Sequence, residues 1–311
     1  YQTPFKMRNN LTTLRLSYDI TGDAYSTVLA IALTDPETGK TSYLWSDYQY
    51  WLALREWKRR EEKSLLFSHS NRNADNTYAL KGTNGRPVPI SAGLFEQISP
   101  SNVRYYTTLT AELLEDYLFD LCYNLLGTNE RKFIALTGEM GMREFDRILK
   151  EKVATFNLID TKFITGSGQE LTLGGQFTTY KMTNGIELTL KRCPLFDNME
   201  LFRQLHPLTG KPLMSYTFMF VDLGSRDGQA NVVKVCRKGR EFVQWSTGGS
   251  VVPSGYANSI NTIRSNSRDG YQVHFLGEEG IMLRNPLSCG ILYCDAEDTE
   301  MSNNGAPTVA A

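Results

Sequence analysis

The stretch TAELLEDYLFDLCYNLL at Thr110–Leu126 carries the clearest folding signal in the sequence. Its leucines recur every three or four positions from Leu114 to Leu125, so one face of a helix would be hydrophobic. Acidic residues lie near its start, where the helix dipole favours negative charge, and Gly127 follows where a left-handed cap is expected. We therefore predict an amphipathic helix that packs one side against a core.

The residues that follow predict a strand, a helix and then mainly strands. Lys132–Leu136 has the length and apolar content of a strand, and residues 141–153 form a helical apolar stripe that includes Phe145. Asn184-Gly185 precedes the alternating stretch Ile186–Leu190, the strongest hairpin signal in the chain. Further strands are predicted at residues 180–182, 216–221, 231–236, 241–245, 271–276, 281–283 and 291–294. This order of elements predicts an α+β fold.

Before this region the sequence predicts two strands and a charged helix. Residues 14–33 form two extended pieces around a turn at residues 21–23. Residues 48–67 are rich in helix formers, with tryptophans on one side. In the centre of this helix, eight of the nine residues from Arg55 to Lys63 are ionic, and Glu56 can pair with Arg60 at the i,i+4 spacing. We expect a helix with one solvated face.

Residues 68–100 differ in amino-acid composition from both neighbouring helices. Asparagine, glycine and proline punctuate this segment, and few apolar residues separate them. A stretch of this kind cannot bury much of itself, and it is long for a loop inside a compact domain. We predict that it is either disordered or a projecting hairpin that packs on something else.

The composition of the chain argues against several classes of protein. The chain has 311 residues, which predicts about two structural units, and a formal net charge of -1, which does not fit a strongly basic nucleic-acid binder. No stretch approaches the roughly 18 apolar residues of a spanning helix, so no membrane association is predicted. Five cysteines, an odd number, predict reduced thiols rather than a disulfide framework. The chain begins at Tyr1, and we expect that an upstream segment was cleaved or lies outside the sequence.

A search for catalytic, metal and cofactor motifs gives one weak candidate. Gly39-Lys40-Thr41 has the end of a phosphate loop, but Thr34 stands where its first glycine belongs and Pro36 removes a backbone amide. The three histidines are isolated, and no cysteine pair has ligand spacing. We predict no catalytic residues, no metal and no cofactor. A nucleotide-binding enzyme or binding domain that uses Gly39-Lys40-Thr41 stays open as an alternative.

The order and amino-acid composition of several segments resemble those of the major capsid proteins of tailed bacteriophages with the Hong Kong 97-type fold. The crAss-like phages are the branch that we name for this resemblance. The segments that carry the resemblance are Glu62–Phe67, Asn84–Pro87, Thr110–Leu126, Phe133–Leu136, Tyr180–Leu188, Phe218–Asp222 and Gly280–Pro286. The resemblance spans about residues 45–295. An encapsulin-like compartment shell protein is a second alternative, because its segments have the same order and composition.

The resemblance implies a division of the chain into an arm, a loop and two interleaved domains. The segments are an N-terminal arm (1–45), a charged helix of the peripheral domain (46–67), an extended loop over a neighbouring subunit (68–100), a peripheral spine helix (101–130), a first axial part (131–175), a peripheral strand region (176–215), a second axial part (216–268), and peripheral strands with a C-terminal tail (269–311).

The resemblance also implies a function and partners. The chain would be a structural protein rather than an enzyme, and it would assemble with copies of itself as hexamers and pentamers into an icosahedral head. Its other partners would be decoration, portal and scaffolding proteins and nonspecifically contacted double-stranded DNA. It would assemble in the host bacterial cytoplasm and reside in the virion.

Five side chains are candidate inter-subunit contacts. They are Tyr78 and Arg86 in the loop and Arg55, Arg59 and Arg60 on the charged helix. For each of them, the alternative is an ordinary solvated charge or surface ring.

Overall fold

The computed structural model describes residues 8–34, 41–73, 75, 77–123, 131–156, 179–181, 185–226, 228–249 and 267–295. The chain divides into two compact units, and each combines two separate stretches of sequence. Unit 1 comprises Tyr1–Glu96 and Lys234–Met282, and unit 2 comprises Gln97–Val233 and Leu283–Ala311. Helices and strands are both present in the described ranges, which confirms the predicted α+β class. Within those ranges, no helix is long and apolar enough to cross a membrane.

Unit 1 is built on a long antiparallel sheet. The sheet contains β1 (Thr12–Thr21), β11 (Val232–Cys236), β12 (Val243–Gly248) and β13 (Gly270–Leu283). β13 is the shared partner, because β1, β11 and β12 all pair with it, and β1 does so over ten residues from Thr12↔Glu279 to Thr21↔Gly270. Residues 12–21, which the resemblance placed in an arm, are therefore an integral strand of this sheet.

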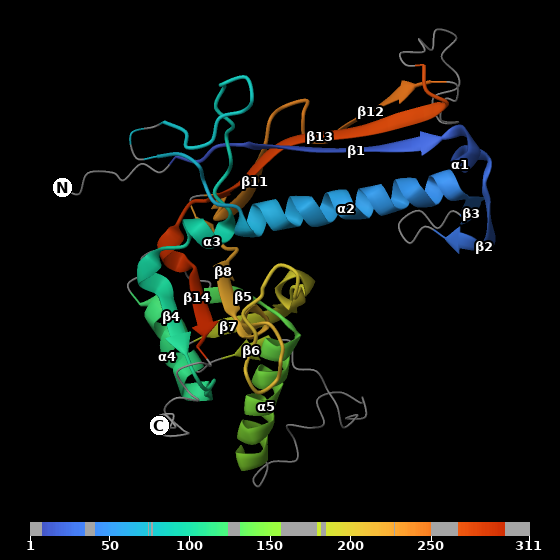
Figure 1. Cartoon of the computed structure of the whole chain (residues 1–311). Coiled ribbons are helices and arrows are strands. Elements are labelled where there is room, and N and C mark those ends of the chain that lie inside the picture. Colours follow the sequence, from blue (N-terminus) through green and yellow to red (C-terminus); the bar gives the residue numbers. More distant parts are fainter. Residues whose placement is uncertain are drawn as a thin grey trace, which may run out of the picture. The chain divides into compact units, whose positions relative to one another are not determined.

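The long helix α2 (Trp45–Phe67) runs alongside β1 and β13 (Figure 1). Alternate residues of β1 turn inward, ending at Ile20, as the period of a strand requires. Ile20 packs in one cluster with Trp57 of α2 and Phe275 of β13. Trp57 is 4% exposed, although the helix around it is densely charged. The predicted helix with one solvated face is confirmed.

A short helix and a two-stranded ribbon connect β1 to α2. The predicted turn at residues 21–23 is the start of α1 (Gly22–Ser26), which is capped by the Thr21 hydroxyl accepting a hydrogen bond from the Ala24 amide. β2 (Val28–Thr34) then pairs with β3 (Thr41–Leu44). Residues 35–40, between these two strands, lie outside the described residues.

The segment after α2 forms a projecting hairpin at its tip and a packed, irregular stretch at its base. Side chains from Ala79 to Pro89 are exposed, apart from Gly82. Asn71 is buried and holds the base, because its amide donates to the Val88 carbonyl and its Oδ1 accepts from the Ile90 amide. The expectation that the segment buries little of itself is confirmed for the tip and wrong for its return path, where Ser91–Leu94 is buried.

Unit 2 is built on a six-stranded mixed sheet in the order β4-β14-β8-β5-β7-β6. Its strands are β4 (Val103–Tyr106), β5 (Arg131–Thr137), β6 (Thr179–Lys181), β7 (Ile186–Arg192), β8 (Phe218–Asp222) and β14 (Gly290–Cys294). The pairs β4–β14 and β5–β7 are parallel, and the other neighbours are antiparallel. The predicted hairpin is confirmed as β6–β7, with Gly185 at φ 76° as its turn demands.

Helices α4 (Ala111–Cys122) and α5 (Glu139–Phe156) share one hydrophobic core with this sheet. The core joins Leu118 of α4, Phe145 of α5, Leu188 of β7 and Phe218 of β8. The resemblance divided these four segments between a peripheral and an axial domain. In the structure they belong to a single unit.

The predicted end of α4 is wrong. Thr110 caps its start by accepting a hydrogen bond from the Leu113 amide, but the helix stops at Cys122. Tyr123 is extended, with φ -65° and ψ 130°, so the helix has ended before Gly127 could cap it. The apolar stripe itself is confirmed from Leu114 to Leu121, while Leu125 lies outside the described residues.

Short elements complete the described chain. They are α3 (Leu94–Gln97), η1 (Pro100–Asn102), η3 (Pro194–Asp197), η4 (Leu213–Tyr216), β9 (Ser225–Arg226), β10 (Gln229–Ala230) and η6 (Pro286–Ser288).

Candidate functional site

The two predicted contact residues of the loop have different environments. Tyr78 is half-buried, and its hydroxyl donates to Asn10 Oδ1 at 3.3 Å, so it anchors the base of the hairpin. Arg86 is exposed beside Gly85, whose φ of 72° makes the tight turn. Within the described ranges, the Arg86 guanidinium has no ion-pair partner. Arg86 is therefore the better placed of the two to meet another molecule.

The three predicted arginines of α2 lie on its solvated side. Arg60 forms an ion pair with Glu56 at 2.8 Å, as the i,i+4 spacing predicts. The Arg55 guanidinium lies 5.6 Å from the centre of the Trp51 ring, a cation–π contact. Arg59 is exposed one turn after Arg55. None of the three is buried, and they lie on a different element from Tyr78 and Arg86.

An ionic cluster inside unit 1 was not predicted from the sequence. Lys234 of β11 forms ion pairs with Glu61 of α2 and with Glu279 of β13, the latter at 2.7 Å. Burial raises the pKa of Glu279, which is 2% exposed. A buried carboxylate needs a partner, and Lys234 provides one. The cluster joins helix to sheet; Glu279 is buried, whereas the Lys234 side chain is 44% exposed.

The neighbouring Glu278 has separate partners. Arg237 and Arg240 approach its carboxylate at 3.0 Å and 2.5 Å. Although burial opposes ionisation, the hydrogen bonds from Arg240 and Arg237 outweigh it and lower the pKa of Glu278. Glu278 and Glu279 thus contact different groups, as expected of neighbours on a strand.

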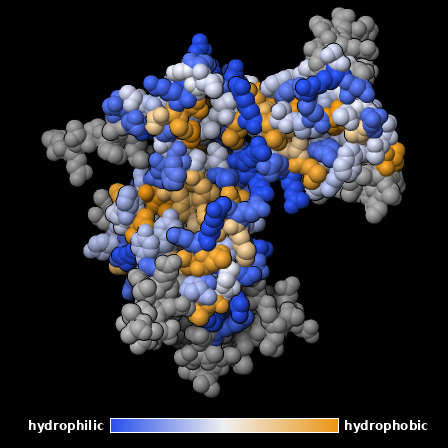
Figure 2. Space-filling view, in the orientation of Figure 1, coloured by the Kyte–Doolittle hydropathy of each residue, from blue (hydrophilic) through white to orange (hydrophobic). Residues whose placement is uncertain are grey.

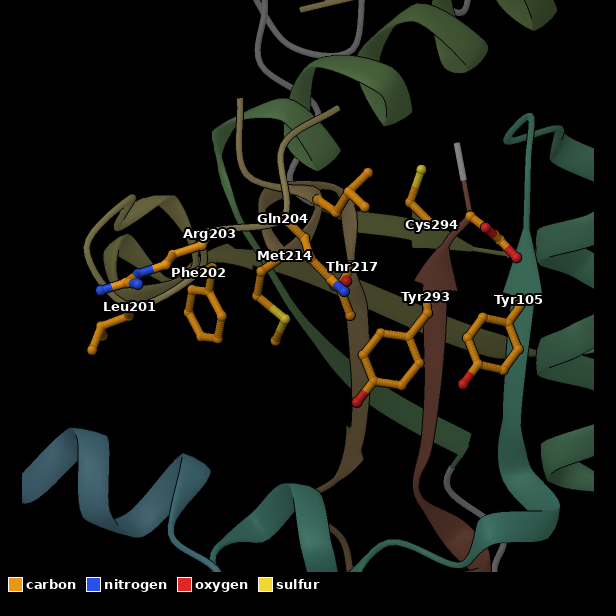
Figure 3. A pocket seen from close by; sticks show the side chains of 11 residues that line it. Tyr105, Leu201, Phe202, Arg203, Gln204, Met214, Thr217, Tyr293 and Cys294 are labelled. Atoms are coloured by element: carbon orange, nitrogen blue, oxygen red, sulfur yellow. The ribbon is translucent and has the colours of Figure 1, made fainter. Parts of the chain in front are cut away.

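An open groove of about 660 Å³ lies in unit 2 (Figure 3). The rings of Tyr105 and Tyr293 stack at its edge, with centroids 5.6 Å apart, and Tyr105 is 68% exposed. The remaining lining residues are Leu201, Phe202, Arg203, Gln204, Leu213, Met214, Thr217, Cys294 and Asp295. Burial raises the pKa of the Cys294 thiol to about 11, so at neutral pH it is protonated and a poor nucleophile. The groove has the character of a contact surface rather than a reaction centre.

Metal and nucleotide chemistry have no assembled site in the described part of the chain. No group of three or more His, Cys, Asp or Glu side chains there could hold a metal ion. The five cysteines are all free thiols. Thr41 begins strand β3, whereas a phosphate loop requires a helix to begin there; Gly39 and Lys40 lie outside the described residues.

Exposed apolar side chains are spread over several elements. On the face drawn in Figure 2, hydrophobic areas in orange are separated by hydrophilic areas in blue. The exposed large apolar residues are Val28, Leu80, Val88, Tyr105, Phe119, Tyr123, Met199, Leu205, Leu208, Leu223, Val235, Phe242, Trp245 and Leu287. Singly exposed apolar side chains are common on protein surfaces, so they do not by themselves define a site.

The chain belongs to the Crassvirus major capsid protein family, whose family model matches residues 1–297. It is 30% identical over 256 residues to the major capsid protein of Bacteroides phage crAss001, and the match covers 77% of this chain and 50% of that protein. The chain therefore spans about half the length of this relative. This membership confirms the family predicted from the sequence, the crAss-like branch included, and favours it over the nucleotide-binding and encapsulin-like alternatives.

Two solved structures are similar over most of the chain. The holo-SrpI encapsulin complex from Synechococcus elongatus PCC 7942 is 10% identical, with 97% of this chain and 78% of that chain covered and a TM-score of 0.46. Gordonia phage Cozz is 10% identical, with 95% and 76% covered and a TM-score of 0.43.

Proposed function

We propose that this chain is a subunit of the icosahedral head shell of a tailed phage, arranged in hexamers and pentamers around a double-stranded DNA genome. Membership of the capsid protein family over residues 1–297 is the observation that carries the proposal. The subunit acts by assembly, without catalysis or a cofactor. It is made in the host bacterial cytoplasm and resides in the virion.

The projecting hairpin supports a shell that interlocks. Its tip exposes Leu80 and Val88, at 53% and 44%, and a lone subunit gains nothing from leaving these side chains in water. A neighbouring subunit that covers the tip would remove this surface from water. We therefore keep the extended-loop role for this segment and narrow it to the hairpin tip, residues 79–89.

The balanced charge of the chain determines how strongly the proposed shell would attract DNA. The chain has 33 basic and 34 acidic residues, so a shell of such subunits would contact packaged DNA without a strong attraction. Portal, scaffolding and decoration proteins are further partners in the proposal. Each would bind a surface that the hexamers and pentamers leave open.

Electron microscopy of the purified protein tests the proposal. Closed shells or rings are expected, whereas a protein that stays monomeric and gains thermal stability from ATP would overturn it. Deleting Asn73–Pro89 tests the hairpin separately. We expect this variant to fold, with an unchanged far-ultraviolet circular dichroism spectrum, and to form no shells; normal shells would refute the role of the hairpin.

A further inference from the structure

The hairpin tip combines two free cations with two exposed apolar side chains. Lys81 and Arg86 are exposed, and neither has an ion-pair partner among the residues the structure describes. Leu80 and Val88 face each other across the hairpin, because the Val88 amide donates to the Leu80 carbonyl at 3.1 Å. We call residues 79–89 the hairpin tip. It presents positive charge at its end and apolar surface just behind.

One stripe of α4 has the complementary composition. Glu112, Asp116, Phe119 and Tyr123 follow one another at intervals of four, three and four, so they share one face of the helix and its C-terminal cap. All four are exposed, and the rings of Phe119 and Tyr123 lie 5.7 Å apart. We call these four residues the outer stripe of α4. Its first half is acidic and its second half is aromatic.

The acidic half of the outer stripe has no cation of its own in the described ranges. Asp120, which lies beside the stripe, is paired with Arg104 at 2.5 Å, but neither Glu112 nor Asp116 has such a partner. The opposite side of α4 is buried in the unit 2 core. The outer stripe is therefore a surface with unbalanced negative charge beside apolar rings.

We propose that the hairpin tip of one copy of this chain docks on the outer stripe of α4 in a second copy. This inference rests on the proposed shell function and identifies the surface that receives the hairpin. Charge complementarity selects the occupant, since two free cations meet two free carboxylates. The apolar residues have corresponding places on the two surfaces. Leu80 and Val88 lie farther from the hairpin turn than the two cations do. Phe119 and Tyr123 lie C-terminal to the two carboxylates on α4.

The long side chains of Lys81 and Arg86 can cover the difference in spacing between the two surfaces. From the middle of the acidic pair to the middle of the aromatic pair is seven residues of α4, or about 10 Å at a rise of about 1.5 Å per residue. On the hairpin, Arg86 lies two residues from Val88, or about 7 Å along an extended strand, before the reach of its own side chain is added.

The groove edged by Tyr105 and Tyr293 is the competing surface. Its charged lining residues are Arg203 and Asp295, one of each sign. It therefore offers the two cations of the hairpin tip no net attraction. The outer stripe is the better match on charge, and both surfaces present aromatic rings.

Charge reversal with rescue tests the contact. The variant K81E/R86E and the variant E112K/D116K should each keep the wild-type circular dichroism spectrum and yield at least tenfold less shell material by sedimentation and electron microscopy. The quadruple variant, in which both signs are exchanged, should recover shells to within about twofold of the wild type. K211E/K238E is the matched control, because both side chains are exposed and the net charge changes by the same amount; it should assemble as the wild type does.

Mixing the two reversed variants distinguishes a contact between copies from one within a chain. When the variants are co-expressed, the reversed hairpin of one variant can meet the reversed stripe of the other, so rings of six in which the two variants alternate should return. Rescue in the quadruple variant but no such rings in the mixture would overturn the proposal, as would normal assembly of K81E/R86E. If the wild type forms shells and the reversals are harmless, only the docking surface is wrong. If the wild type never assembles, the shell function and this inference both fall.

Discussion

Gly290 and Tyr117 make the tightest test of the unit 2 core. A Cβ added at Gly290 of β14 would lie 2.1 Å from the Tyr117 hydroxyl oxygen and 3.0 Å from Leu121 Cδ2. The hydroxyl cannot simply turn away, because it donates to the Asn102 carbonyl at 2.5 Å, with the Ile291 carbonyl 3.3 Å away. Gly290→Ala therefore has to displace a buried tyrosine that is 2% exposed.

The expected magnitude follows from two effects. Overpacking costs about 1–3 kcal/mol, and a buried carbonyl that loses its donor costs about 1–3 kcal/mol, offset by about 0.5 kcal/mol from the stiffer unfolded chain. We expect Gly290→Ala to lower the free energy of unfolding by about 1.5–5.5 kcal/mol in total. Tyr117→Phe alone should lose about 1–2 kcal/mol, since it removes the hydrogen bond and leaves the ring.

The double variant tests whether the clash between the new methyl group and the Tyr117 hydroxyl causes the loss of stability. Phenylalanine has no hydroxyl to clash with the new methyl group, so G290A/Y117F should be more stable than the sum of the single losses by at least about 1 kcal/mol. Urea unfolding followed by circular dichroism measures all three variants. Tyr105→Phe, an exposed tyrosine on β4, is the control and should change little. Strict additivity, or a harmless Gly290→Ala, would refute the reasoning.

Three further predictions concern other parts of the molecule. Phe275→Ala removes a ring that is 1% exposed at the centre of the unit 1 core, and chemical denaturation should show a loss of about 3–5 kcal/mol. The pKa of Glu278 is lowered by Arg240 and Arg237, so its contribution to stability is complete above the ordinary carboxyl pKa and disappears as the pH falls through the lower folded value. Glu278→Gln should accordingly reduce the melting temperature at pH 7 and flatten its decline on acidification; an unchanged acid limb would contradict this. Burial raises the pKa of the Cys289 thiol to about 11, so Ellman's reagent should modify it in the native protein far more slowly than in urea.

Local patterns in the sequence predicted the helices and the β6–β7 hairpin well. The leucine stripe of α4 and the alternation of Ile186–Leu190 report burial directly, because each residue's spacing determines its face. The exposed tip at residues 79–89 also followed from composition, since a run of glycine, asparagine and proline offers little to bury. These signals depend on neighbours in the sequence only.

Long-range pairing was beyond such reasoning. β1 pairs with β13, and β4 with β14, although each pair is separated by most of the chain. The division into the two compact units includes these pairings, which local sequence patterns do not reveal. The same cause hid the Lys234 cluster, whose members come from α2, β11 and β13. The end of α4 was missed because Gly127 is a good cap only if the helix extends to it.

The candidate contacts show the same limit. Both Arg86 and Tyr78 are candidates because they stand in a polar segment, but the sequence does not tell which of the two is exposed. In the structure Arg86 is exposed, whereas the Tyr78 hydroxyl donates to Asn10 Oδ1. Whether either residue contacts another subunit stays a prediction.

The position of β13 in the chain has a consequence for synthesis. β1 is translated long before β13, the strand that pairs with it over ten residues. Until then β1 and the aromatic side of α2 lack their covering partner, and such surfaces are prone to mispairing. The sheet of unit 1 can form completely only when translation has passed residue 283. A polypeptide that stops before β13 therefore has no finished unit 1 surface.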